Sequence, residues 1–166
     1  MSDQIRYSIS VTPVETLTTE NSTTEDVIAS EVNKSLGGSG TAAVTSYGRD
    51  ADVQGYKDAA VNYREAIDSA DTTDISSESA ATFLYIKNTG FAYSSATVLG
   101  AALSKAVKVM SGTTLLSVLD PGEPFGPLKD DNGGIDCTGI HVRTVDLDGS
   151  ENASAGHLAV EFLAVK

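Results

Sequence analysis

The stretch from Met110 to Lys166 contains the clearest strand and turn patterns, and it constrains the fold more than any other part of the chain. Between Thr138 and Val145, apolar Ile140 and Val142 alternate with His141 and Arg143. Nearer the end, apolar side chains recur at every second position, as Leu158, Val160, Phe162 and Ala164. A period of two is typical of a strand with one buried face. This part of the chain therefore predicts a β-sheet with a clear inside and outside.

The turn signals agree with antiparallel strands. Asp120–Glu123 (DPGE) puts Pro and Gly at the two central positions of a type II turn. Four more stretches have strand patterns, Ile5–Val11, Thr82–Lys87, Ala106–Met110 and Thr114–Leu119, and Ala42–Ser46 is a shorter candidate. We expect loops or turns at Thr16–Asp26, Gly37–Gly40, Asn88–Gly90 and Pro124–Gly134, which are rich in Gly, Pro or small polar residues.

Two segments fit either a helix or a strand. Thr24–Leu36 can be a helix capped by Thr24 and stopped by Gly37, or can hold a short strand over Val32–Leu36, which is favoured slightly. Tyr56–Ile67 has apolar residues at helical spacing, with an edge strand over Ala60–Ile67 as the alternative. The fold class is thus mainly β, an antiparallel β-sandwich or jelly roll of about seven or eight strands with room for one short helix.

Length and composition fit one domain. A chain of 166 residues can bury a core without a metal or disulfides, and no repeat or linker divides it. We therefore expect a single β-sandwich domain over residues 1–166, in which residues 1–30 can include an extended arm or loop. With 6% aromatic residues and no Trp, the core must be mainly aliphatic.

Charge excludes several kinds of partner. The formal net charge is −12, and the 11 Lys and Arg residues are scattered, whereas a nucleic-acid surface needs them clustered. No apolar run reaches the length of a membrane-spanning helix. The first residues, MSDQIRYSIS, lack the pattern of a secretory signal, and there is one cysteine, so we expect folding in a reducing cytoplasm. Neither nucleic acid nor a membrane is an expected partner.

Acidic turns are the candidates for a metal site. Asp146, Asp148 and Glu151 surround Gly149, and Asp130, Asp131 and Asp136 lie in a comparable loop. Carboxylates at such spacing can bind calcium, but the full set of ligands and the flanking helices of an EF-hand are missing. A solvated hairpin loop is the simpler interpretation. We expect no cofactor, because the Gly-rich stretch Gly37–Gly40 has no P-loop Lys and no dinucleotide-binding context.

No set of residues predicts catalysis. His141 and His157 lie on separate predicted strands, and neither has a nucleophile at a recognisable spacing. We expect His141 to be a solvated strand residue and His157 a surface or interface residue. Cys137 has acidic or neutral neighbours, which favours a small buried thiol over a reactive one. The prediction is a protein that is not an enzyme, with a carbohydrate-binding β-sandwich as an alternative of another class.

The phrase TTLLSVLDPGEPFGPLK, the strand CTGIHVRTV and the closing AVEFLAVK together resemble a pattern of small virion structural proteins of tailed bacteriophages. VNKSLGGSGTAAV and ATFLYIKNTG are also similar to their counterparts in that group. The resemblance implies a capsid decoration or cement protein on the virion surface, often a trimer, whose partner is the major capsid protein. A tail or head-tail component is the alternative. We expect the N-terminal arm and the loop around Pro124–Pro127 to make contacts.

Overall fold

The structure is a computed structural model that describes residues 3–11, 14–18, 24–28, 36–44, 56–59, 75, 79–130, 132–150 and 157–165. Every regular element in these residues is a strand, so the predicted mainly β fold class is confirmed, and no described residue is helical. The chain divides into two compact units. Residues 4–41 form one, and residues 42–166 with residues 1–3 form the other.

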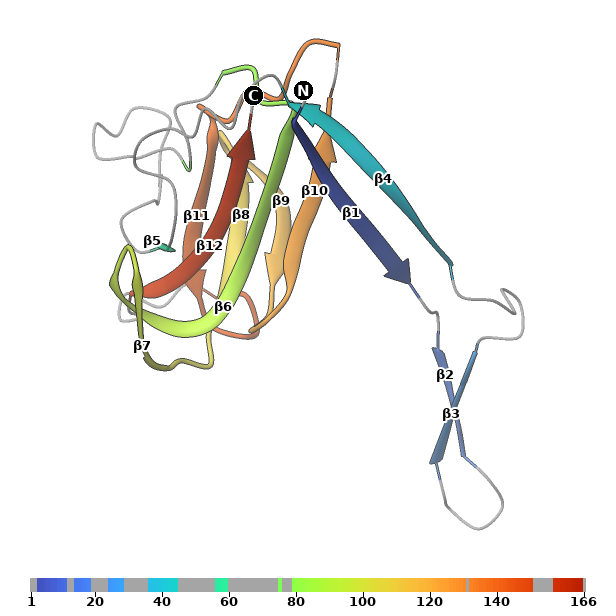
Figure 1. The fold of residues 1–166 in the computed structure, drawn as a ribbon. Helices are drawn as coiled ribbons and strands as arrows, with labels where there is room; N and C mark the ends of the chain where they lie inside the picture. Colours follow the sequence, from blue (N-terminus) through green and yellow to red (C-terminus); the bar gives the residue numbers. More distant parts are fainter. Residues whose placement is uncertain are drawn as a thin grey trace. The chain divides into compact units, whose positions relative to one another are not determined.

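The described residues of the larger unit form eight strands in two antiparallel sheets (Figure 1). The first sheet has the order β10-β6-β12-β5, and β7 pairs with the far end of β6. The second sheet has the order β11-β8-β9. The bounds are β5 Tyr56–Asp58, β6 Phe83–Ser95, β7 Val98–Ala102, β8 Ala106–Ser111, β9 Thr114–Leu119, β10 Pro124–Lys129, β11 Ile140–Val145 and β12 Leu158–Val165.

One aliphatic core joins the faces of these sheets. The predicted inward row of β12, Leu158, Val160, Phe162 and Ala164, is buried in it, as expected. Leu84 and Ile86 of β6 lie in the same core, facing Val107 and Val109 of the second sheet. Each fully buried side chain of this size contributes about 1.5–3 kcal/mol by leaving water. The alternating pattern therefore specifies a two-layer sandwich.

A buried asparagine fixes the place where the chain crosses between the sheets. Asn88 of β6 is fully buried, and its side-chain Nδ2 donates to the carbonyl oxygens of Lys105 and Leu119, both at 2.9 Å. Its Oδ1 accepts the N–H of Gly90 at 2.9 Å. Its backbone exchanges two further bonds with the turn after β9, at Gly122 and Glu123. All its polar atoms are therefore satisfied inside the core, which a buried amide requires.

The smaller unit is a ribbon of paired strands. β1 (Asp3–Val11) pairs with β4 (Leu36–Val44), and β2 (Val14–Thr18) pairs antiparallel with β3 (Thr24–Ile28). Because β2 and β3 lie between β1 and β4 in the sequence, the second hairpin is nested within the first. Gly37 is needed in the outer ladder, since a Cβ at this position would lie 2.7 Å from the carbonyl oxygen of Ile9. We call residues 4–41 the ribbon.

Several predicted loops are strands, and these predictions were wrong for physical reasons. A ribbon without a buried face needs no apolar alternation, so Thr16–Asp26 gave no strand signal although it overlaps β2 and β3. Gly37–Gly40 lies within β4, where the close approach of the β1 backbone accounts for Gly37. The predicted turn at Asn88–Gly90 lies inside β6, and the Pro-rich segment Pro124–Lys129 is edge strand β10, where proline is tolerated.

Other local predictions have clear outcomes. The turn at Asp120–Glu123 is confirmed, with Glu123 N–H bonded to Asp120 O at 2.9 Å and a φ of 89° at Gly122. In the two ambiguous segments, the described elements are strands, β3 with the start of β4 in one and β5 in the other, where Ala59 follows in a turn. The favoured strand over Val32–Leu36 and the alternative over Ala60–Ile67 lie outside the described residues, apart from Leu36.

Candidate interaction surface

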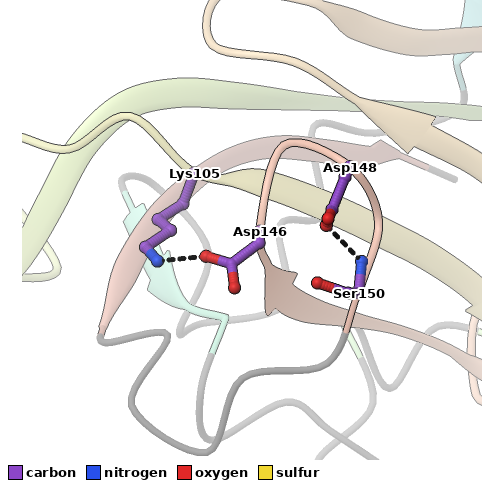
Figure 2. Close-up of polar contacts among 4 residues, drawn as sticks. All are labelled: Lys105, Asp146, Asp148 and Ser150. Carbon is purple, nitrogen blue, oxygen red and sulfur yellow. Dashed lines mark hydrogen bonds and ion pairs between the residues drawn. The ribbon is translucent and has the colours of Figure 1, made fainter.

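In the acidic turn predicted as a candidate metal site, the described carboxylates bond to other groups of the protein (Figure 2). Asp146 forms an ion pair with Lys105, and Asp148 Oδ1 accepts the backbone N–H of Ser150 at 2.8 Å. The turn closes through the Gly149 N–H, which donates to Asp146 O at 2.8 Å. Glu151 lies outside the described residues. The two described carboxylates thus bind separate partners of the protein and do not converge on one point.

The second acidic loop behaves similarly. Asp130 Oδ1 accepts the backbone N–H of Asn132 at 2.8 Å, and Asp136 Oδ1 accepts the Thr138 hydroxyl at 2.6 Å and its N–H at 3.0 Å. Asp131 lies outside the described residues. Across the part of the chain that the structure describes, no group of three or more His, Cys, Asp and Glu side chains could hold a metal ion. The described carboxylates are local caps of turns.

Acid sensitivity of the Asp148 turn is testable. Hydrogen bonds from the Ser150 side chain and backbone lower the pKa of Asp148 below its usual 3.8. A lowered folded-state pKa stabilises the fold above the unfolded-state pKa, and this contribution is lost as pH falls through the folded value. We expect Asp148→Asn to lose less melting temperature than the wild type between about pH 5 and about pH 2. Equal losses in thermal unfolding followed by circular dichroism would contradict this.

The two histidines have different environments. His141 on β11 is fully buried, so the prediction of a solvated residue was wrong, and its Nδ1 lies 3.3 Å from Gly139 O. The prediction failed because its face of β11 is covered, which strand periodicity cannot show. His157 is 67% exposed, as predicted for a surface residue, and its Nδ1 lies 2.5 Å from Asp58 Oδ2. This pair ties β5 to the start of β12.

Cys137 is confirmed as a small buried residue. Its side chain is fully buried in the core of the sandwich, and its Sγ lies 3.7 Å from the carbonyl oxygen of Ile135. Such a thiol packs as an apolar group.

An apolar strip is exposed on the outer face of the second sheet. Because Val107 and Val109 point into the core, the residues that alternate with them on β8 lie on the opposite face. There, β9 exposes Leu115, Leu116 and Val118 at 49%, 41% and 38%. β11 lies at the other edge of this sheet, and there the outer face is covered, because His141 is buried. We call Leu115, Leu116 and Val118 the β9 strip.

Three of the outer strands of the sandwich, β10, β5 and β11, carry features that discourage pairing with another chain. β10 contains two prolines and an irregular register, and β5 is three residues long. Lys57 of β5 stands opposite inward-facing Val160, with its Nζ 5.0 Å from the ring centre of Phe162. On β11, Arg143 supplies a charge and Ile75 N–H already bonds Ile140 O at 2.7 Å. Prolines, short strands and inward charges are the usual protection of sheet edges.

β9 lacks such protection apart from one irregularity. Its sequence, TLLSVL, has neither charge nor proline, and it pairs only with β8 among the described strands. Its ladder shifts at Leu116, between the pairs Met110–Leu115 and Val109–Ser117. An exposed apolar edge of this kind is a ready partner for another strand or face. The sequence held a signal that we did not use, since adjacent Leu115 and Leu116 cannot both be buried by strict alternation.

The described side chains of the ribbon form no core of their own. No described side chain in residues 4–11 or 36–41 is buried. Ile9, Val11 and Leu36 are exposed at 45%, 53% and 45%. A two-stranded ribbon in water is marginally stable at best. Its apolar side chains therefore gain by contact with another surface.

The described residues thus form an all-β fold with an exposed apolar edge at β9 and exposed apolar side chains on the ribbon. No family model, curated protein or solved structure matches the chain. No helix in the described residues combines the length and apolarity needed to cross a membrane.

Proposed function

We propose that this protein is a virion structural protein, a capsid decoration or cement protein that binds and stabilises the shell built by the major capsid protein. The proposed class is that of small β-sandwich virion proteins of tailed bacteriophages, which the strand and turn phrases around Asp120–Glu123 resemble. In this role the protein is not an enzyme. It acts on the capsid surface of the virion after synthesis in the host cytoplasm, as a trimer by the same resemblance.

The ribbon is the observation that carries the proposal. A sandwich with its own core needs no long two-stranded extension for stability, whereas residues 4–41 expose Ile9, Val11 and Leu36. Such a segment is stabilised when its apolar side chains are buried on a larger surface. A capsid offers the same surface many times. Binding there adds buried area that links neighbouring capsomers, which is how a cement protein opposes internal pressure.

The net charge of −12 suits the same role. Like charges keep the free protein dispersed at high concentration before assembly. Uncharged parts of the surface, such as the exposed apolar side chains of the ribbon, then make the contacts with the capsid. Electrostatic repulsion is weakest at these parts.

The test uses expanded capsids that lack the protein. We expect saturable binding and a higher capsid melting temperature on addition of the wild type. Ile9→Ser with Val11→Ser should weaken binding about tenfold or more, because two half-exposed apolar side chains lose their contacts. Val98→Ser is the matched control, since Val98 of β7 is 54% exposed but lies outside the ribbon. Absence of wild-type binding, with an unchanged melting temperature, would refute the proposal.

Copy number and position on the particle separate the shell from the tail. A particle reconstruction that places this chain in the tail or at the head-tail junction would replace the decoration role with that of a tail component. Density over the shell, at a copy number proportional to that of the major capsid protein, is the expected result.

A further inference from the structure

The outer edge of β9 has no partner strand among the described residues. β9 pairs along one side with β8, and every second residue of such an antiparallel edge strand turns its N–H and C=O away from its neighbour. Apart from the β8 ladder, no described residue bonds to the backbone of residues 114–118. β9 itself carries no charge, although the chain has a formal net charge of −12. Two copies can therefore meet at this edge without placing carboxylates of β9 against each other.

The irregularity at Leu116 decides which strand can fit this edge. Leu115 stands opposite Met110 and Val118 stands opposite Lys108, so both lie on the outer face although they are three positions apart. A regular strand returns to the same face at every second residue. Paired with β9, it would match the faces of β9 on only one side of Leu116. A partner that matches on both sides needs the same irregularity at the corresponding place.

A second copy of β9 that runs in the opposite direction has that irregularity. We propose that two copies of this chain join through their β9 edges, around a two-fold axis that passes between Leu116 and Ser117. Each Leu115 then stands opposite Val118 of the other copy, so that outer-face side chains meet outer-face side chains along the ladder. The two three-stranded sheets become one sheet of six strands, and the two copies of the β9 strip cover each other.

The charges at the ends of β9 favour this antiparallel contact over a parallel one. Asp120 and Glu123 are exposed directly after the strand, whereas Gly112 and Thr113 before it are uncharged. Antiparallel pairing puts the acidic turn of each copy beside the uncharged turn of the other. Parallel pairing would put the two acidic turns side by side, which like charge opposes.

Lys108 does not prevent the contact. It lies on β8, one strand away from the edge, so three strand spacings, about 14 Å, separate its two copies in the six-stranded sheet. Salt screens charges at that distance, because the Debye length is about 8 Å at physiological ionic strength.

The contact is isologous, since each copy contributes the same patch. It can therefore join two trimers of the kind that the proposed function expects. No capsid protein takes part in it, so the inference goes beyond the proposed function.

Sedimentation of the full chain without capsids tests the contact. We expect the wild type to double its mass as its concentration rises in analytical ultracentrifugation. Val118→Lys should dimerise at least tenfold more weakly, because its ammonium group would be buried against Leu115 of the other copy. Val98→Lys is the matched control, since Val98 of β7 is 54% exposed and lies outside the strip, so it should dimerise like the wild type. Circular dichroism checks that each variant is folded.

Single cysteine variants test the register. Leu115→Cys in one copy would stand opposite Val118→Cys in the other, within the Cα separation of about 4.4–6.8 Å that a disulfide needs. Two copies of the same variant would hold their thiols about 10 Å apart along the strands, which is too far. Under mild oxidation we expect a disulfide-linked dimer in a mixture of the two variants and little in either variant alone. The natural Cys137 is buried and does not compete.

Three results would overturn the proposal. They are a wild type of constant mass up to its highest soluble concentration, a Val118→Lys variant that dimerises as strongly as the wild type, and single variants that cross-link alone as well as in the mixture. If Val118→Lys lost only its binding to capsids, the strip would belong to the major capsid protein, and the proposal would again be wrong. Capsid binding by the wild type is measured separately, so failure here leaves the proposed function standing.

Discussion

Asn88→Asp is expected to lower the free energy of unfolding by about 3 to 5 kcal/mol, a large part of the stability of a domain this size. The substitution keeps the shape of the side chain but replaces the Nδ2 donor with an oxygen. That oxygen then faces the carbonyl oxygens of Lys105 and Leu119, both 2.9 Å from Nδ2 in the wild type. Of the bonds described, only the one from the Gly90 N–H would remain to the buried charge, and it cannot compensate the loss.

Urea unfolding followed by circular dichroism gives the comparison. Asn132→Asp is the matched control, because Asn132 is exposed in the loop after β10 and should change stability by less than about 0.5 kcal/mol. Similar losses for the two variants would show that Asn88 does not organise the crossing between the sheets.

Gly134→Ala should cost about 3 kcal/mol or more, through two separate effects. The φ of Gly134 is 80°, a left-handed conformation that costs an L-residue about 1–2 kcal/mol. In addition, a Cβ at this position would lie 2.6 Å from Cα of Ala80. The backbone there is held by two bonds between Ala81 and Ile135, at 3.0 and 2.7 Å, so it cannot move away without breaking them.

Gly149→Ala isolates the first effect. Gly149 has nearly the same φ, 78°, but nothing lies within 4 Å of its added Cβ. We expect it to lose only the conformational part, about 1–2 kcal/mol, so that the difference between the two variants measures the contact with Ala80. If both lost the same amount in urea unfolding, the close packing of the Ala80 backbone would be disproved.

The predictable part of the fold is the part with a core. Alternation identified the inward row of β12 and the strands of the second sheet, because burial on one face leaves a period of two in the sequence. It failed at Asn88, whose polarity indicated a turn although its side chain is satisfied inside β6. It also failed in β2 and β3, where no described core enforces a pattern.

The candidate surface was harder to predict than the fold. A list of strands does not say which strands form the edges, and the order β11-β8-β9 places β9 at an edge only once the pairing is known. The same pairing sets Lys108 opposite Arg143, residues far apart in the sequence. Conversely, the acidic turn at Asp146 was visible at once from composition, but the bond to Lys105 depends on how the strands approach each other.

The strand order of the first sheet also determines when the sandwich can form during synthesis. β12 lies between β6 and β5, yet the ribosome makes it after all the other described strands. Until it emerges, β6 can pair only with β7 and β10 among its partners in the sheet, and its long ladder with β12 stays empty. Non-local pairing of this kind comes late in folding. A nascent chain therefore closes its core only once β12 has emerged, so translation products that are interrupted before β12 cannot build a complete sandwich.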